Sequence, residues 1–270
     1  MSKEKDKDED LVSLDDDPEP VKDKASGKAS ADSKDDDFKE AEVNDIASVV
    51  ATMKVPFSSI VVSKRNSGKS FLVKDLCYNL SVQKRIHQVI VMSNTSGLSL
   101  NKDYDFVDKK FLTTFAQEKI ERLMKLQTKA IKAGKIREIL LVLDDVIGGD
   151  GTKKAEGNRL IRSLYANGRH FHISVILLSQ IANRLLEPPL RENSDYIFFS
   201  RLGMRGLETL WESIPVIRKK EFIRFASTHN KDYTFILYDN MTQSNDPMDF
   251  LYLVKADERK FLLNQKVMEK

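Results

Sequence analysis

Apolar residues follow two alternating patterns along this chain, from near residue 43 to about residue 256. Runs rich in β-branched and aromatic residues predict buried strands at 57–62, 87–93, 138–144, 172–180, 196–201, 233–239 and 249–256. Apolar residues at helical spacing predict helices at 71–80, 111–133 and 156–168, and two shorter helical patterns follow residue 201. The chain is therefore expected to alternate between strand and helix.

Strands that are apolar throughout and are separated by helices indicate a mostly parallel sheet with helices on both faces. The last two predicted strands have no long helix between them, so we expect them to form an antiparallel pair or edge near the C-terminus. The expected fold class is α/β, with one domain over residues 41–270.

Residues 1–40 have a different composition, dominated by Asp, Glu, Lys and Ser, and we expect a disordered acidic arm there. The arm holds 15 acidic and 8 basic residues, a net charge of −7, and the remainder holds 26 acidic and 36 basic residues, a net charge of +10. A basic domain suggests a polyanionic partner, with nucleic acid the first candidate. The alternative is that the charge serves solubility alone.

The single cysteine, Cys77, excludes a disulfide framework and a Cys-based zinc site. Its apolar neighbours predict a buried thiol in a reducing compartment. The N-terminus lacks the apolar segment of a secretory signal, and no apolar run approaches the ~20 residues of a membrane span. We therefore expect a protein that is not secreted and has no membrane span.

The stretch SKRNSGKS, Ser63 to Ser70, lies between a predicted strand and a predicted helix, which is the context that a phosphate-binding loop requires. Backbone N–H groups and the helix N-terminus would surround the phosphates of a nucleotide. Lys69 would reach the β- and γ-phosphates, and Ser70 would hold Mg²⁺. Serine at position 63, where the motif expects glycine, puts the exact shape of the loop in question. The predicted contact residues are Ser63, Lys64, Arg65, Asn66, Ser67, Gly68, Lys69, Ser70 and Phe71.

Two aspartates, Asp144 and Asp145, end the apolar run ILLVL. A strand of this kind carries its last residues to the sheet edge where the loop lies, so Asp144 is predicted to bind Mg²⁺ and Asp145 to polarise the attacking water. Gln180 ends the next predicted strand and is placed to contact the γ-phosphate or the water. The alternative for the two aspartates is a solvated turn, and the alternative for Gln180 is an ordinary polar residue at a strand end.

Three ordered motifs, IVVSKRNSGKS, VLDD and GRHFHISVILLSQ, resemble those of viral genome-packaging ATPases of the FtsK–HerA superfamily, of the type in nucleocytoplasmic large DNA viruses and virophages. The resemblance covers residues 53–256. It implies a RecA-like P-loop core that uses ATP and Mg²⁺, with Lys69, Asp145 and Gln180 catalytic. It also implies a homo-oligomeric ring that pumps duplex DNA into a capsid, with capsid or portal-vertex proteins as partners, in the virion or the host-cell cytoplasm.

In that superfamily an arginine finger precedes the strand that follows the Asp-Asp strand, and Arg169 matches this place. Within its own subunit Arg169 should lie at the sheet end opposite the phosphates, so it would act on a neighbour. The alternative is an arginine that bonds the last carbonyls of a helix.

Two further functions stay open: a P-loop assembly scaffold with little turnover, and a small-molecule kinase. Five basic residues on the long predicted helix fit either a DNA track or a solvated face: Lys119, Arg122, Lys125, Lys129 and Lys132. The glycine-rich stretch 148–157 predicts a mobile loop whose Lys153 and Lys154 contact DNA, or an ordinary connection.

Overall fold

The computed structural model describes residues 42–94, 102–147, 152–180, 182–212, 217–229 and 231–263. Within these residues one sheet of nine strands runs in the order β1-β9-β8-β7-β2-β6-β5-β3-β4. The acidic arm expected over residues 1–40 lies outside the described residues.

The strand bounds agree with most of the predicted apolar runs. The strands are β1 Val43–Asp45, β2 Ser58–Ser63, β3 Gln88–Ser93, β4 Leu112–Thr114, β5 Ile139–Asp144, β6 Ile173–Ser179, β7 Tyr196–Ser200, β8 Thr234–Asp239 and β9 Leu251–Lys255. The helices are α1 Ile46–Thr52, α2 Lys69–Val82, α4 Gln117–Lys132, α5 Thr152–Asn167, α6 Ala182–Leu185, α7 Pro188–Arg191, α8 Met204–Trp211 and α9 Lys219–His229.

The sheet is mostly parallel, as the alternation of strands and helices predicted. Strand β8 alone runs against the others, pairing antiparallel with β7 on one side and with β9 on the other. The predicted antiparallel pairing near the C-terminus is therefore confirmed. The outermost strand on that side is β1, which pairs parallel with β9 and was not predicted.

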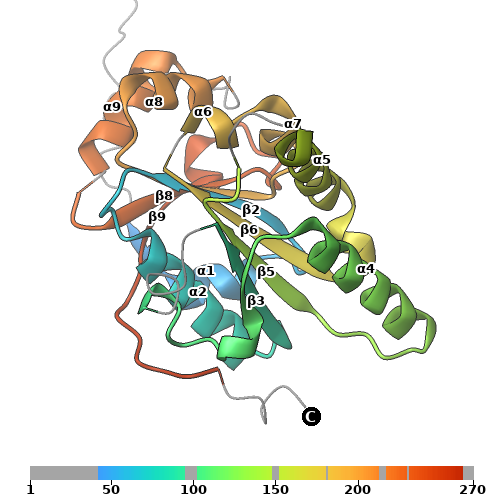
Figure 1. The fold of residues 1–270 in the computed structure, drawn as a ribbon. Helices are drawn as coiled ribbons and strands as arrows, with labels where there is room; N and C mark the ends of the chain where they lie inside the picture. Colours follow the sequence, from blue (N-terminus) through green and yellow to red (C-terminus); the bar gives the residue numbers. More distant parts are fainter. Residues whose placement is uncertain are drawn as a thin grey trace, which may run out of the picture. The chain divides into compact units, whose positions relative to one another are not determined.

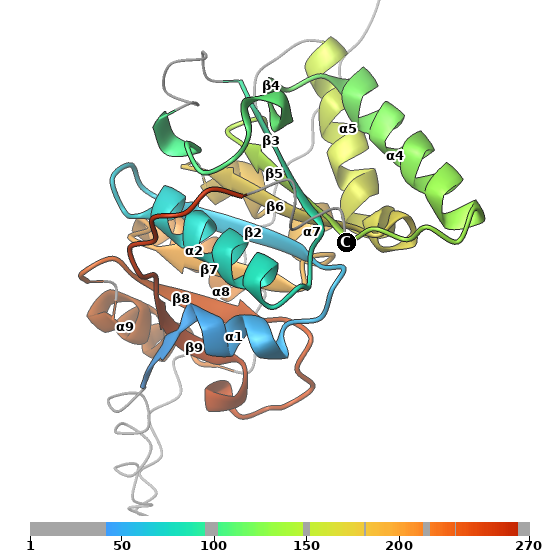
Figure 2. The ribbon, with the colours of Figure 1, turned by 90° about the horizontal axis from the view of Figure 1, so that it is seen from below.

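Helices cover both faces of the sheet (Figure 1). Alternate residues of a strand point to opposite faces, so Ile60 and Val62 pack with one group of helices and Val61 with the other. One core contains residues of α4 to α9, and the second contains residues of α1 and α2. Figure 2 shows α1 and α2 side by side on their face of the sheet.

The predicted helix 111–133 was wrong at its start. Phe111 ends a short 3₁₀ turn, residues 112–114 form edge strand β4, and α4 begins only at Gln117. Strand β4 pairs with β3. A sheet edge that accepts another strand therefore overrides the apolar spacing at this end of the segment.

The described C-terminal residues 256–263, here called the C-terminal strap, attach to helix α2. The buried carboxylate of Asp75 accepts hydrogen bonds from the Asp257 N–H and from Nε of Arg259, both at 2.8 Å. The Phe261 ring lies 5.0 Å from the ring of Tyr78 and 5.1 Å from that of Phe106, between centroids. The strap therefore joins α2 to the segment that holds Phe106.

Cys77 is buried on α2, as predicted. Burial raises the pKa of its thiol, because the thiolate would lose its hydration. Among the described residues, no helix has the length and apolar character that crossing a membrane requires.

Candidate active site

The loop of Ser63 to Ser70 connects the C-terminal end of β2 to the first turn of α2. Ser63 is the last residue of β2, is fully buried, and pairs with Ser200 of β7. Since Ser63 has ordinary strand conformation, the position does not need the positive φ that would favour glycine. The positive φ values lie instead at Asn66, with φ 58°, and Gly68, with φ 89°.

Helix α2 begins at Lys69 and has Gly68 as its N-cap, which makes no side-chain capping bond. The first N–H groups of a helix lack partners within the helix, so they favour an anion in the loop. Ser67 adds a buried hydroxyl that has no hydrogen-bond partner among the described residues. Phe71, in the first turn, is exposed.

The Lys69 side chain folds back over the loop. Its Nζ donates to the carbonyl oxygens of Ser63 at 2.8 Å and Lys64 at 2.9 Å. Burial lowers the pKa of Lys69, whereas Asp144 and Asp145 act in the opposite direction. The structure therefore places this lysine within electrostatic reach of both aspartates.

Asp144 is the last residue of β5, and burial raises the pKa of its carboxyl to about 6. The Tyr104 hydroxyl donates to Oδ2 of Asp144 at 3.0 Å, and this bond acts to lower the pKa. Tyr104 is buried, and burial raises its own pKa well above the usual value. A neutral phenol therefore holds one oxygen of the carboxylate.

Asp145 follows β5 with φ 51°, a left-handed conformation that is uncommon for residues other than glycine but that aspartate adopts more readily than most. Its N–H donates to the Leu178 carbonyl at 3.1 Å, and its Oδ2 accepts from Nε2 of Gln180 at 3.2 Å. Strand β6 lies between β2 and β5, so Gln180 stands between the loop and the aspartates. The structure thus brings Gln180 and Asp145 into contact.

The oxygen ligands available here fit magnesium. Ser70 lies in the first turn of α2, and Asp144 supplies a carboxylate at the same sheet edge. No cluster of three His, Cys, Asp or Glu side chains suited to a metal occurs in the described part of the chain. Mg²⁺ needs no such cluster, because it commonly binds one or two protein oxygens together with substrate phosphates.

Arg169 does not join this group. It lies in the 3₁₀ helix Gly168–Phe171 before β6 and forms an ion pair with Asp195. The other oxygen of Asp195 accepts from the N–H of Ser58 at 2.8 Å, and Ser58 is the first residue of β2. Arg169 therefore lies at the sheet end opposite the loop, with half of its side chain exposed. Its partner is a carboxylate, not the helix carbonyls of the alternative interpretation.

Tyr104 is the residue of this site that sequence reasoning missed. It belongs to no motif, and it reaches Asp144 from 40 positions earlier in the chain. The only signal was an aromatic residue between two aspartates, KDYDF, which is common in loops.

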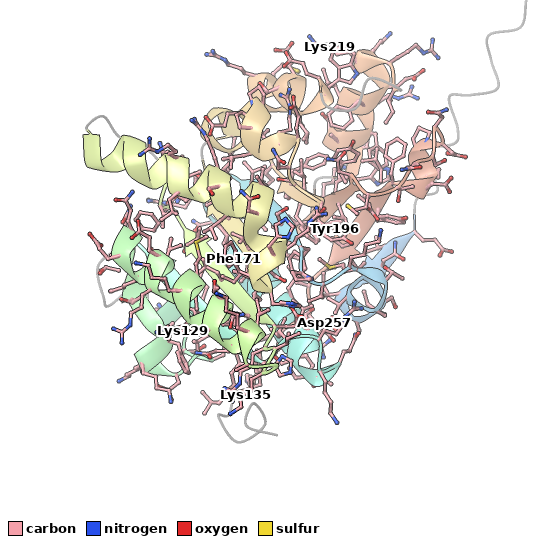
Figure 3. All side chains as sticks on the ribbon, turned by 90° about the vertical axis from the view of Figure 1, so that its right-hand side faces the viewer. Lys129, Lys135, Phe171, Tyr196, Lys219 and Asp257 are labelled. Carbon is pink, nitrogen blue, oxygen red and sulfur yellow. The ribbon has the colours of Figure 1, made fainter. Side chains whose placement is uncertain are left out.

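The basic residues predicted as DNA contacts have different positions. Lys119, Arg122, Lys125, Lys129 and Lys132 are all exposed on α4, and Figure 3 labels Lys129 there. Both interpretations of this face stay open.

The predicted loop 148–157 was too long, since α5 begins at Thr152 and includes Lys153 and Lys154 in its first turn. Residues 148–151 lie outside the described residues.

Comparison with known proteins gives viral relatives. The chain is 23% identical over 233 residues to a protein of Acanthamoeba polyphaga mimivirus, covering 77% of this chain and 76% of that protein. It is 28% identical over 205 residues to protein 015R of Frog virus 3, covering 73% of this chain and 61% of that one.

Among solved structures, the chain resembles B204, the DNA-packaging ATPase from Sulfolobus turreted icosahedral virus. The TM-score is 0.53 at 20% identity, and the match covers 76% of this chain and all of B204. A B204 structure in complex with ATP-gammaS gives a TM-score of 0.51. This likeness establishes the P-loop NTPase fold. The family model described as Poxvirus A32 protein matches residues 49–267, and the chain belongs to that family.

Proposed function

We propose that this protein is an ATP-hydrolysing motor that translocates duplex DNA and packages a viral genome into a preformed capsid. The observation that carries the proposal is the gathering of Lys69, Asp144, Asp145 and Gln180 beside the loop. Membership of the Poxvirus A32 family and the likeness to B204, a DNA-packaging ATPase, support it.

ATP would bind with its phosphates against the backbone of residues 63–71. Lys69 would neutralise charge on the β- and γ-phosphates, in place of its present bonds to two loop carbonyls. Ser70 and Asp144 are the residues that would hold Mg²⁺, which supplies charge neutralisation at the phosphate oxygens. Tyr104 would keep the Asp144 carboxylate in orientation.

Hydrolysis needs a water molecule aimed at the γ-phosphorus. We assign Asp145 to accept a proton from this water as its oxygen attacks, and Gln180 to hold Asp145 in position. Arg169 would act on the γ-phosphate of a neighbouring subunit, since it lies far from the loop of its own. This assignment requires a ring of identical subunits.

Duplex DNA is the proposed substrate of translocation, and the charge of +10 beyond residue 40 favours it. Capsid or portal-vertex proteins are the proposed docking partners, in the virion or at the assembly site in the host cytoplasm. The acidic residues 1–40 are proposed to stay disordered and to compete with DNA for the basic surface or to tether the motor to a basic capsid patch.

The test is ATP hydrolysis by the full chain with and without duplex DNA. A motor should hydrolyse ATP, and duplex DNA should stimulate the rate. Lys69→Ala should abolish hydrolysis, and Asp145→Asn should retain ATP binding while stopping turnover. Absence of turnover under all conditions would favour the assembly scaffold. Phosphate transfer to a small acceptor, without stimulation by DNA, would favour the kinase.

A further inference from the structure

The reversed direction of β8 brings an aromatic residue to the phosphate loop. Because β8 is antiparallel to β7, its first residues lie beside the end of β7, on the same sheet edge as the loop. The Ser200 hydroxyl donates to the Thr234 carbonyl at 2.9 Å and fixes this start. Tyr233, the residue before β8, therefore lies next to the phosphate loop.

The side chain of Tyr233 lies against the loop at Gly68. A Cβ atom added to Gly68 would lie 3.1 Å from Cδ1 and 3.5 Å from Cβ of Tyr233. A side chain at position 68 would therefore push the tyrosine ring away by a few tenths of an ångström, and the positive φ at this position also favours glycine. Despite this contact, 63% of the surface of Tyr233 is exposed to solvent.

The backbone of Tyr233 is also unusual. Asp232 and Tyr233 have consecutive positive φ values of 50° and 60°, and the Thr234 N–H closes the turn onto the Lys231 carbonyl at 2.9 Å. A bulky residue rarely adopts this conformation. Such strained residues are concentrated at ligand-binding sites, where they hold a side chain in a fixed place. Here the turn leaves the aromatic side chain largely in solvent.

We propose that Tyr233 is the platform on which the base of the bound nucleotide stacks. The proposal rests on the proposed function, since it requires a nucleotide whose phosphates occupy the loop. An aromatic side chain against the loop backbone offers an apolar surface to the base end of that nucleotide. An aromatic ring can stack with any of the bases, because each base has a π-face. The platform therefore predicts similar binding of ATP and GTP.

The test compares nucleotides with a ligand that has phosphates but no base. Calorimetry with Mg²⁺ would measure the affinity of the full chain for ATP, GTP and inorganic tripolyphosphate. Tyr233→Ala should lower the affinity for ATP and for GTP by roughly tenfold or more, which is the usual contribution of one stacked base. Tripolyphosphate affinity should not change, and Tyr233→Phe, which keeps the ring, should behave as wild type.

A spectroscopic measurement detects stacking of the base directly, without relying on a change in affinity. The triphosphate of 2-aminopurine riboside loses fluorescence when its base stacks. When enough protein is present to bind all of this nucleotide, wild type and Tyr233→Phe should quench its emission, and Tyr233→Ala should not. Thermal unfolding of each variant would identify any that fails to fold, and Tyr233→Leu then replaces alanine.

Three results would overturn the platform while the proposed function survives. In the first, Tyr233→Ala binds ATP with wild-type affinity. In the second, Tyr233→Ala loses affinity for ATP and for tripolyphosphate by the same factor, which would mean that Tyr233 only shapes the loop. In the third, the variant changes self-association in sedimentation without changing nucleotide affinity, which would assign Tyr233 to a subunit contact. If wild type bound neither ATP nor tripolyphosphate, the proposed function itself would be overturned.

Discussion

The hydroxyl of Tyr104 donates a hydrogen bond to Oδ2 of Asp144 at 3.0 Å. The Tyr104 ring lies 6.1 Å from the ring of Phe106, and Phe106 contacts Phe261 of the C-terminal strap. The Leu263 N–H donates to the Phe106 carbonyl at 2.8 Å. The proposed magnesium ligand is thus supported by residues from two segments far from it in the sequence.

Tyr104→Phe should weaken binding of the metal. Partners of a metal ligand commonly change metal affinity by about tenfold or more when they are removed. We expect a rise of roughly tenfold in the free Mg²⁺ concentration that gives half-maximal ATP hydrolysis. Electron paramagnetic resonance titration of Mn²⁺ with ADP present would measure the same loss directly. Tyr252→Phe, whose hydroxyl donates to the Asp249 carbonyl, is the matched control. Unchanged metal affinity in Tyr104→Phe would exclude the supporting role.

Asp144→Asn should stabilise the protein in the absence of metal and nucleotide. Burial raises the pKa of Asp144 from 3.8 to about 6, so the folded state binds more protons than the unfolded chain between these values. Well below pH 3.8 the carboxyl is neutral in both states, and the burial of its charge costs nothing. Above pH 6 the folded state holds a poorly solvated charge, at a cost on the order of 1–3 kcal/mol.

Urea unfolding with EDTA would measure this effect. Asp144→Asn should exceed wild type in free energy of unfolding at pH 7.5, and the difference should shrink as the pH falls toward 4. Glu121→Gln, which changes an exposed carboxylate on α4, should leave stability nearly unchanged at both pH values. A less stable Asp144→Asn protein at pH 7.5 would mean that the charge is well compensated.

Ser63→Gly should leave ATP hydrolysis within about twofold of wild type. Ser63 has strand conformation and pairs with Ser200, so glycine adds no backbone freedom that the loop uses. Ser63→Leu is the contrasting variant, because the fully buried position has no room for a large side chain. Steady-state hydrolysis rates would compare the three proteins. Appearance of activity only in the glycine variant would show that the natural loop does not work.

Arg169→Ala and Asp145→Asn proteins should each be nearly inactive alone and should regain partial activity when mixed. In a mixed ring, an intact Asp145 of one subunit meets an intact Arg169 of its neighbour. A mixture of Lys69→Ala and Asp145→Asn proteins is the control, since every site in it keeps one defect. Normal hydrolysis by Arg169→Ala alone would exclude this arginine and leave Arg162 or Arg184 as candidates.

Folding must be checked in this experiment, because Arg169 forms an ion pair with Asp195, whose side chain is 4% exposed. Loss of the arginine leaves that carboxylate with its bonds to Ser58. Thermal unfolding should show a moderate loss of stability in Arg169→Ala. Arg169→Lys retains the charge and should restore stability. A lysine that restores stability without activity would separate the two roles of this position.

Arg259→Ala should loosen the C-terminal strap. The carboxylate of Asp75 is fully buried and would lose its charged partner, which costs roughly 1–3 kcal/mol for a buried group left short of hydrogen bonds. Arg218→Ala, which breaks an exposed pair with Glu221, should cost less than about 1 kcal/mol. Urea unfolding would measure both. Equal effects would mean that the strap contributes little to stability.

The sequence was sufficient for the parts of the fold that depend on local pattern. Strands such as 139–144 are apolar up to their last residue, and their alternation with helices allowed a mostly parallel sheet to be predicted. The same reasoning missed β1, because three residues, of which one is a valine, carry too little pattern. It also extended helix 111–133 through β4, since Phe111 and Phe115 fit helical spacing.

The site was predictable only where its residues belong to motifs. Lys69, Asp144, Asp145 and Gln180 could be expected at one edge, because parallel strands end together. Their catalytic roles remain predictions. Tyr104 and Tyr233 approach the loop region from other segments, through the packing of Phe106 and the reversal of β8. No spacing within the sequence encodes such contacts, which depend on the complete fold.

Strand β2 holds the loop, and its two neighbours in the sheet begin only at residues 173 and 196. During synthesis the loop therefore leaves the ribosome more than a hundred residues before either strand that fixes it. Contacts between such distant segments form late. A chain interrupted before residue 173 would carry the whole loop sequence without the sheet that shapes it. Incomplete translation products should therefore neither retain ATP nor enter assemblies as defective subunits.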